Sequence, residues 1–102
     1  MLPKYLRLSH WDFLVVKASG KSLSFPYFSV LYYPHFPGRV AIVTSTKLSK
    51  SAVVRNRLRR QIYSCIPKSD FDIILFPKQS MLKLSHDQIS SEIDSLVSKL
   101  SH

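Results

Sequence analysis

The sequence predicts an α+β fold, a two-layer sandwich in which helices pack on one mixed four-stranded sheet in the order α-β-β-β-α-β-α. A chain of 102 residues suits one compact domain, so residues 1–102 are expected to form a single unit. Hydrophobic residues make up 45% of the chain and twelve residues are aromatic, which a disordered basic tail would not carry. A helical pattern between the third and fourth strand-like segments favours a parallel crossover.

The first helix is expected from residue 10 to residue 18 or 19, since Ser9 can cap its first turn. Gly20 is expected to end it in the left-handed conformation. At 100° per residue, four apolar side chains share a stripe that should face the core: Trp11, Leu14, Val15 and Ala18. Phe13 falls on the opposite side of the helix, beside Lys17, which is unusual for an aromatic residue of an amphipathic helix.

Three strands are expected next, rich in aromatic and β-branched residues. The first, over residues 21–25, is short and is ended by Pro26. The second covers residues 27–33, and the third covers residues 39–45 after a turn-forming segment with two prolines and a glycine. The second and third strands are expected to pair antiparallel.

The segment from residue 47 to residue 60 is the most informative part of the chain, because it holds six basic residues and no acid. A helix is expected from about residue 51 to residue 65, before Pro67. Its apolar side chains form a narrow stripe: Val54, Leu58, Ile62 and Cys65. Like charges at i, i+4, such as Arg55 and Arg59, destabilise a helix by a few tenths of a kcal/mol. Phosphates would supply the missing counter-charges, so nucleic-acid contact is favoured over an ordinary solvated helix face.

The last two elements have clear signals. Residues 71–76 are apolar enough for a central strand, which Pro77 ends. Ser85 and Gln88 form a capping box at the start of the last helix. The apolar residues of this helix share one face: Ile89, Ile93, Leu96, Val97 and Leu100.

The residues give little support for catalysis by the protein alone. The four histidines lie far apart, with no metal-ligand spacing between them. Cys65 lies on the apolar stripe of its helix, so packing is favoured over a nucleophilic role. Asp70 and Asp72 fit a strand-edge role better than cation binding. The cytoplasm is favoured, because the sequence has a single cysteine, no signal-peptide pattern and no apolar run long enough to cross a membrane. The net charge of +9 favours nucleic acid over a membrane surface as the binding partner.

Several segments of the chain together resemble a known family. The run Arg55-Asn-Arg-Leu-Arg-Arg60, preceded by Lys47, Lys50 and Ala52, resembles the RNR signature of the bacterial ribonuclease P protein component. Five further segments fall in the order and spacing of that family: Leu6-Arg-Leu, Asp12-Phe13, Gly20-Lys21-Ser22, Arg39-Val-Ala-Ile-Val and Phe71-Asp-Ile-Ile. The resemblance covers residues 5–100.

The resemblance implies a left-handed β-α-β crossover around the arginine helix, like that of a ribosomal-protein domain and against the usual right-handed preference. It implies that an RNA subunit holds the catalytic Mg²⁺ and hydrolyses the phosphodiester that frees the mature 5′ end of tRNA. The protein, monomeric in the complex, would bind the RNA subunit through seven residues: Lys47, Lys50, Arg55, Asn56, Arg57, Arg59 and Arg60.

A second surface is implied for the single-stranded 5′ leader of precursor tRNA, in a cleft between the first helix and the sheet. The residues that match it are Phe13, Lys17, Arg7 and Tyr32. Lys17 stands where the family usually has a second aromatic residue, which makes the expected leader contact more electrostatic. The strand residue of the cleft is expected at Leu31 or Tyr32, with the register left open.

Two other function classes remain as alternatives. A non-enzymatic RNA-binding or ribosome-associated protein could use the same basic helix. A stand-alone protein nuclease has little support among the residues.

Overall fold

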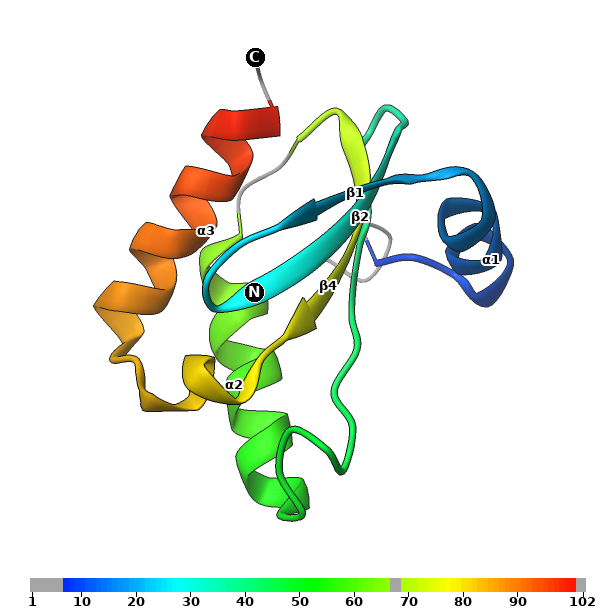
Figure 1. Ribbon diagram of the computed structural model, residues 1–102. Coiled ribbons are helices and arrows are strands. Elements are labelled where there is room, and N and C mark those ends of the chain that lie inside the picture. The colour runs from blue at the N-terminus through cyan, green and yellow to red at the C-terminus, as the bar shows by residue number, and fades with distance from the viewer. Residues whose placement is uncertain (1–6, 67–68, 101–102) are drawn as a thin grey trace.

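The computed structural model describes residues 7–66 and 69–100, which build one four-stranded sheet with helices on both of its faces (Figure 1). The α+β class and the expected order of helices and strands are confirmed, and a 3₁₀ helix that the sequence analysis did not predict follows the last strand. The elements are α1 (His10–Ser19), β1 (Lys21–Ser24), β2 (Phe28–Pro34), β3 (Val40–Ile42), α2 (Ala52–Cys65), β4 (Phe71–Pro77), η2 (Gln79–Lys83) and α3 (His86–Leu100).

The strand order is β1-β2-β4-β3, so the expected antiparallel pairing of the second and third strands is wrong. β2 pairs antiparallel with β1 on one side and with β4 on the other, and β3 pairs with β4 in parallel. β4 is one of the two inner strands, and four successive residues of it are buried, as a strand covered on both faces requires. The loop between β2 and β3 passes the start of β4, where the amide of Gly38 donates to the carbonyl of Ser69.

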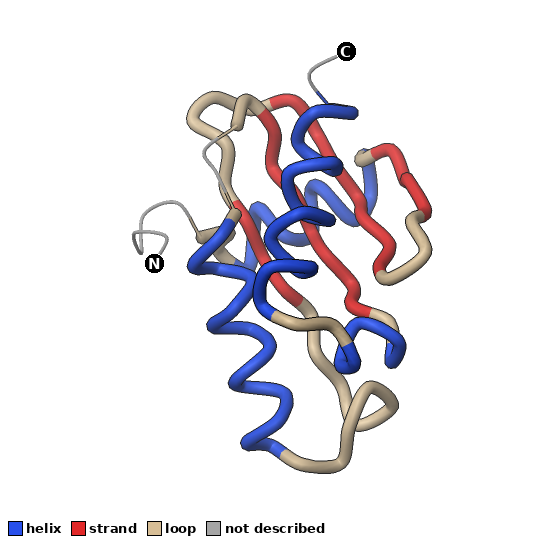
Figure 2. The backbone as a smooth tube through the Cα atoms, turned by 90° about the vertical axis from the view of Figure 1, so that its left-hand side faces the viewer, coloured by secondary structure: helices blue, strands red, loops and turns tan. Residues whose placement is uncertain are grey.

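The crossover from β3 through α2 to β4 is left-handed, as the family resemblance implied. Seen from the side of α2, both strands run downward and β4 lies to the right of β3, with α2 in front (Figure 2). A right-handed connection would place β4 on the other side of β3.

The main core lies between the sheet and the layer of α2 and α3 (Figure 2). Alternate residues of β2 and β4 point into it: Phe28, Val30, Ile73 and Leu75. The helices contribute the positions that the periodicity predicted, with Leu58 and Ile62 buried on α2 and four buried residues on α3: Ile89, Ile93, Leu96 and Leu100. The capping box at α3 is confirmed, since Ser85 and Gln88 each accept the other's backbone amide.

α1 packs on the opposite face of the sheet, so it lies outside the two layers that the sequence predicted (Figure 1). The stripe expected to be its core face is wrong. Trp11, Val15 and Leu14 are 77%, 51% and 43% exposed, whereas Val16 is fully buried. The Ser9 cap is confirmed. Gly20 does not adopt the left-handed conformation, with φ at −72°; it is required because a Cβ there would overlap the carbonyl oxygen of Val16.

Candidate RNA interface

α2 divides its residues between the core and solvent. Leu58 and Ile62 dock on the sheet, while Asn56, Arg57 and Arg60 are exposed. Ser51 caps the first turn by accepting the amide of Val54. The helix therefore presents two arginines and an asparagine away from the core, and we call these three residues, together with Lys47 and Lys50, the basic face.

Arg55 and Arg59 of the same helix are half-buried and are used differently. A guanidinium nitrogen of Arg55 donates to the carbonyl of Ser49 at 2.8 Å, and one of Arg59 donates to Oγ1 of Thr44 at 2.7 Å. Both bonds join α2 to the connection that precedes it. These two arginines thus hold the connection against the helix.

A third bond fixes this connection from another side. The side-chain amide of Gln79, on η2, donates to the carbonyl of Lys47 at 2.8 Å. Leu48 is buried beside it, while Lys47 and Lys50 remain exposed. The two lysines are therefore presented from an anchored segment next to the arginines of α2.

No carboxylate neutralises the arginines of α2 within residues 7–66 and 69–100. The ion pairs in this part of the chain join Arg39 to Asp12 and Asp72, on the other side of the molecule. The basic face therefore carries uncompensated positive charge, which suits a phosphate backbone.

A hollow of about 390 Å³ opens on this side of α2. It is lined by Val53, Asn56, Arg59 and Arg60. Val53 is 73% exposed, although it is apolar and lies in the first turn of the helix. The hollow thus combines an apolar wall with an amide and two guanidinium groups.

The other side of the sheet is organised by Arg39. Its guanidinium forms a fork on Asp72, donating from Nε at 3.0 Å and from Nη2 at 2.7 Å, and its Nη1 donates to Asp12 of α1. Asp72 is 2% exposed and also accepts the amide of Arg39. The hydroxyl of Ser9 and the charge of Arg39 hold the pKa of Asp12 below its ordinary value. This network ties α1 to β4 and is not the plain strand-edge role expected for Asp72.

The four residues predicted for the leader cleft do not come together. Phe13, half-buried, and Lys17, exposed, lie on α1. Tyr32 packs edge-on against Phe71 at the border of the main core, on the α2 and α3 side of the sheet. Arg7 lies over the ring of Tyr63 of α2, 4.7 Å from its centroid. Placing Tyr32 and Arg7 beside Phe13 was therefore wrong.

The strand residue that faces α1 is Leu31, the other of the two expected positions. Side chains alternate along β2, so Leu31 points away from the face of Val30 and Tyr32. It pairs with Ile74, a buried residue of β4 that lies outside the main core. We call Phe13, Lys17 and Leu31, which all keep exposed surface, the α1 face.

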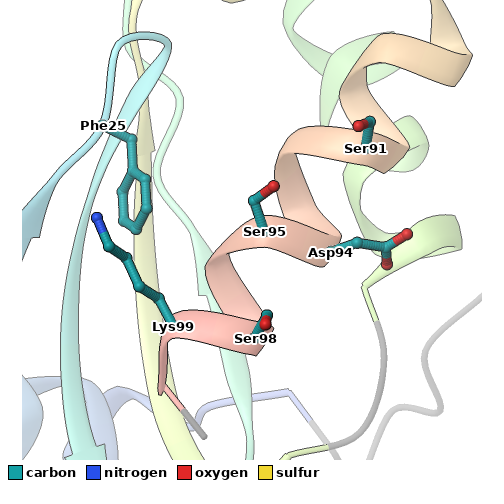
Figure 3. Close-up of a pocket in the computed structure, with 6 residues that line it drawn as sticks. All are labelled: Phe25, Ser91, Asp94, Ser95, Ser98 and Lys99. Atoms are coloured by element: carbon teal, nitrogen blue, oxygen red, sulfur yellow. The ribbon is translucent and has the colours of Figure 1, made fainter. Parts of the chain in front are cut away.

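A second hollow, of about 550 Å³, lies between the turn after β1 and the outer side of α3 (Figure 3). Its lining is Phe25, Ser91, Asp94, Ser95, Ser98 and Lys99, and the ammonium of Lys99 lies 5.3 Å from the centre of the Phe25 ring. It contains none of the predicted site residues.

The described residues hold no cluster of three or more His, Cys, Asp or Glu side chains that could bind a metal ion. Burial raises the pKa of the Cys65 thiol, with a further contribution from Asp94, in line with a packing role. Within residues 7–66 and 69–100, no helix has both the length and the apolar character needed to cross a membrane.

Sequence reasoning missed Thr44, Ser49 and Gln79, which hold the connection before α2, and it missed the pairing of Arg39 with Asp72 on the other side. Asp12 offered a signal for the second set. It is the one acid among residues 1–69, so a basic partner close by was to be expected.

Comparison with known proteins decides the family. The family model described as Ribonuclease P matches residues 2–101. The chain belongs to the ribonuclease P protein family. The ribonuclease P protein component of Synechocystis sp. is 34% identical over an alignment of 110 positions that covers 96% of this chain and 87% of that protein. The one from Microcystis aeruginosa is 42% identical over an alignment of 72 positions that covers 64% of this chain and 60% of that protein.

Solved ribonuclease P proteins share the fold. The protein from Thermotoga maritima matches with a TM-score of 0.75 at 29% identity, covering 91% of this chain and 96% of that one. A Staphylococcus aureus ribonuclease P protein matches with a TM-score of 0.71 at 27% identity, covering 94% of each chain. Sequence and fold thus identify the protein subunit of ribonuclease P, which acts in tRNA 5′ processing together with an RNA subunit.

Proposed function

We propose that the basic face binds the RNA subunit of ribonuclease P. The observation that carries this proposal is the set of exposed, unneutralised cations on an anchored frame: Lys47, Lys50, Arg57 and Arg60, with Asn56 among them. An arginine guanidinium can donate two parallel hydrogen bonds to two oxygens of one phosphate. The hydrogen bonds from Arg55 and Arg59 already hold the preceding connection in place, which reduces the entropy lost when the lysines bind RNA.

The α1 face holds the 5′ leader of precursor tRNA in this proposal. Phe13 offers a half-buried ring for a base, and Lys17 offers a charge for a phosphate one turn along the same helix. Arg39 fixes α1 to the sheet through Asp12, the residue before Phe13. The two faces lie on opposite sides of the sheet, so one protein can hold the RNA subunit and the substrate at once (Figure 1).

The RNA subunit carries out the reaction itself in this proposal, and it holds the Mg²⁺. On this protein, the oxygens of Asp12 and Asp72 are engaged by Arg39 and do not fit a Mg²⁺ site. The protein acts as a monomer in the complex, in the cytoplasm where precursor tRNA is processed.

Reconstitution tests this function. The chain, mixed with its RNA subunit at low Mg²⁺, is expected to stimulate cleavage of precursor tRNA, because its cations offset repulsion between the two RNAs. RNA binding without stimulation would favour a non-enzymatic RNA-binding protein, and cleavage by the protein alone would contradict the division of labour.

The leader contact has its own test on one helix. Phe13→Ala is expected to weaken the complex with leader-bearing precursor tRNA about five- to tenfold, the loss of one stacked base, and to leave mature tRNA unaffected. Trp11→Ala, on the exposed side of α1, is the matched control and should change neither. Equal losses for both substrates, or a collapse of the melting temperature with Phe13→Ala, would contradict the leader contact.

A further inference from the structure

We propose that the hollow lined by Val53, Asn56, Arg59 and Arg60 binds one unpaired nucleotide of the RNA subunit, with its base against Val53. This inference rests on the proposed function of the basic face and extends it. It assigns a base-binding subsite to a surface otherwise built for phosphates.

The placement of Val53 is the first observation. It is 73% exposed, one turn from Arg57 and among cations that have no carboxylate partner within the described residues. A phosphate backbone gains nothing from an isopropyl group, whereas the face of an unstacked base is apolar and can cover it. Val53 therefore marks a place for a base.

The neighbouring side chains supply the rest of a nucleotide site. At 100° per residue, positions 53, 56 and 60 fall within about 60° of the helix surface, so the three side chains form one wall. The Asn56 amide can donate and accept at the same time, as the hydrogen-bonding edge of a base requires. Arg60 is exposed and available for the phosphate of the same nucleotide.

Arg59 makes the hollow a preformed feature. Its guanidinium is held by Thr44 at 2.7 Å, which fixes the side chain at the edge of the hollow before RNA arrives. The volume of about 390 Å³ lies within the range of roughly 300–1,000 Å³ usual for small-ligand pockets. Paired bases cannot enter such a space, so the occupant is an unpaired nucleotide from a loop, bulge or junction.

Salt dependence separates base contacts from phosphate contacts. Val53→Ser and Asn56→Ala are expected to weaken binding of the RNA subunit by about two- to tenfold, the worth of one buried contact or hydrogen bond, without changing the slope of log K against log salt. Arg60→Gln is expected to weaken binding and to lower that slope by up to about one. Val15→Ser, at an exposed apolar position of α1, is the control and should bind as the unchanged protein does.

Chemical probing of the RNA subunit gives a direct readout. One unpaired nucleotide should be protected from a base-modifying reagent by the unchanged protein and become reactive again with saturating Asn56→Ala. Unchanged affinity for both Val53→Ser and Asn56→Ala, or a reduced salt slope with either, would overturn the subsite and leave the RNA-binding face intact. If Arg57→Gln and Arg60→Gln also leave affinity and slope unchanged, the proposed function itself fails.

Discussion

The guanidinium group of Arg39 and those of the exposed arginines of α2 have opposite surroundings. The guanidinium of Arg39 is engaged by two carboxylates, Asp72 and Asp12, and joins a helix to the sheet. Arg57 and Arg60 are exposed and have no carboxylate partner among the described residues. The first arginine completes its bonds inside the fold, whereas the other two keep their donors free for a polyanion. Charge alone thus says little about a cation's role until its partners are known.

The largest expected effect is a loss of stability when Arg39 loses its charge. Arg39→Met leaves the buried Asp72 without its cation and should lower the free energy of unfolding by about 3 kcal/mol, since removing one partner of a buried pair costs roughly 3–5 kcal/mol. Arg57→Met is the matched change and should stay within about 0.5 kcal/mol. Urea unfolding of the two variants measures both, and equal stabilities would show that Arg39 is no more structural than Arg57.

A smaller effect is expected from loosening the anchored connection without touching a charge. Gln79→Ala removes the bond to the carbonyl of Lys47 and should weaken RNA-subunit binding about two- to fivefold, because one hydrogen bond no longer holds the lysines in place. The salt slope should not change, since every cation remains. Gln88→Ala, in the capping box of α3, is the control for a lost side-chain amide. Full affinity with Gln79→Ala would show that the lysines need no anchor.

The smallest expected effect is the pH dependence that Asp12 gives to the stability of the protein. The pKa of Asp12 is lowered in the folded protein, so its charged form contributes stability above its unfolded value near 3.8. That contribution is lost as the pH falls through the lowered folded value. The stability difference between the unchanged protein and Asp12→Asn should therefore be constant near neutral pH and shrink below about pH 4. Thermal unfolding between pH 3 and 7 measures it, and a constant difference would contradict the role of Asp12.

Local patterns predicted the parts of this molecule that local physics controls. Ser9 and Ser85 cap their helices because a hydroxyl three residues before an amide satisfies it wherever the helix lies. The buried positions of α2 and α3 were among those that periodicity predicted, since both helices turn one stripe of apolar residues to the same core. The cations of α2 stood out because no acid is interspersed among them.

Non-local contacts account for the wrong predictions. The apolar stripe of α1 looked like a core face, yet Trp11 is exposed, because the helix is anchored from its other side by Val16 and the bond from Arg39 to Asp12. Tyr32 and Leu31 are neighbours in the chain but lie on opposite faces, so a one-residue uncertainty in register changed the cleft. Strand order was also inaccessible, since β4 enters between β2 and β3 from far along the chain.

Salt dependence of RNA-subunit binding tests the central claim most directly, with the double variant Arg57→Gln/Arg60→Gln compared with the unchanged protein. Removal of the two arginines is expected to lower the slope of log K against log salt by up to about two and to leave the stability unchanged. Lys21→Gln/Lys99→Gln removes the same charge elsewhere and should leave the slope nearly as it was. A slope that does not respond to Arg57 and Arg60, or responds equally to the control, would contradict the claim that the unpaired arginines of α2 bind the RNA.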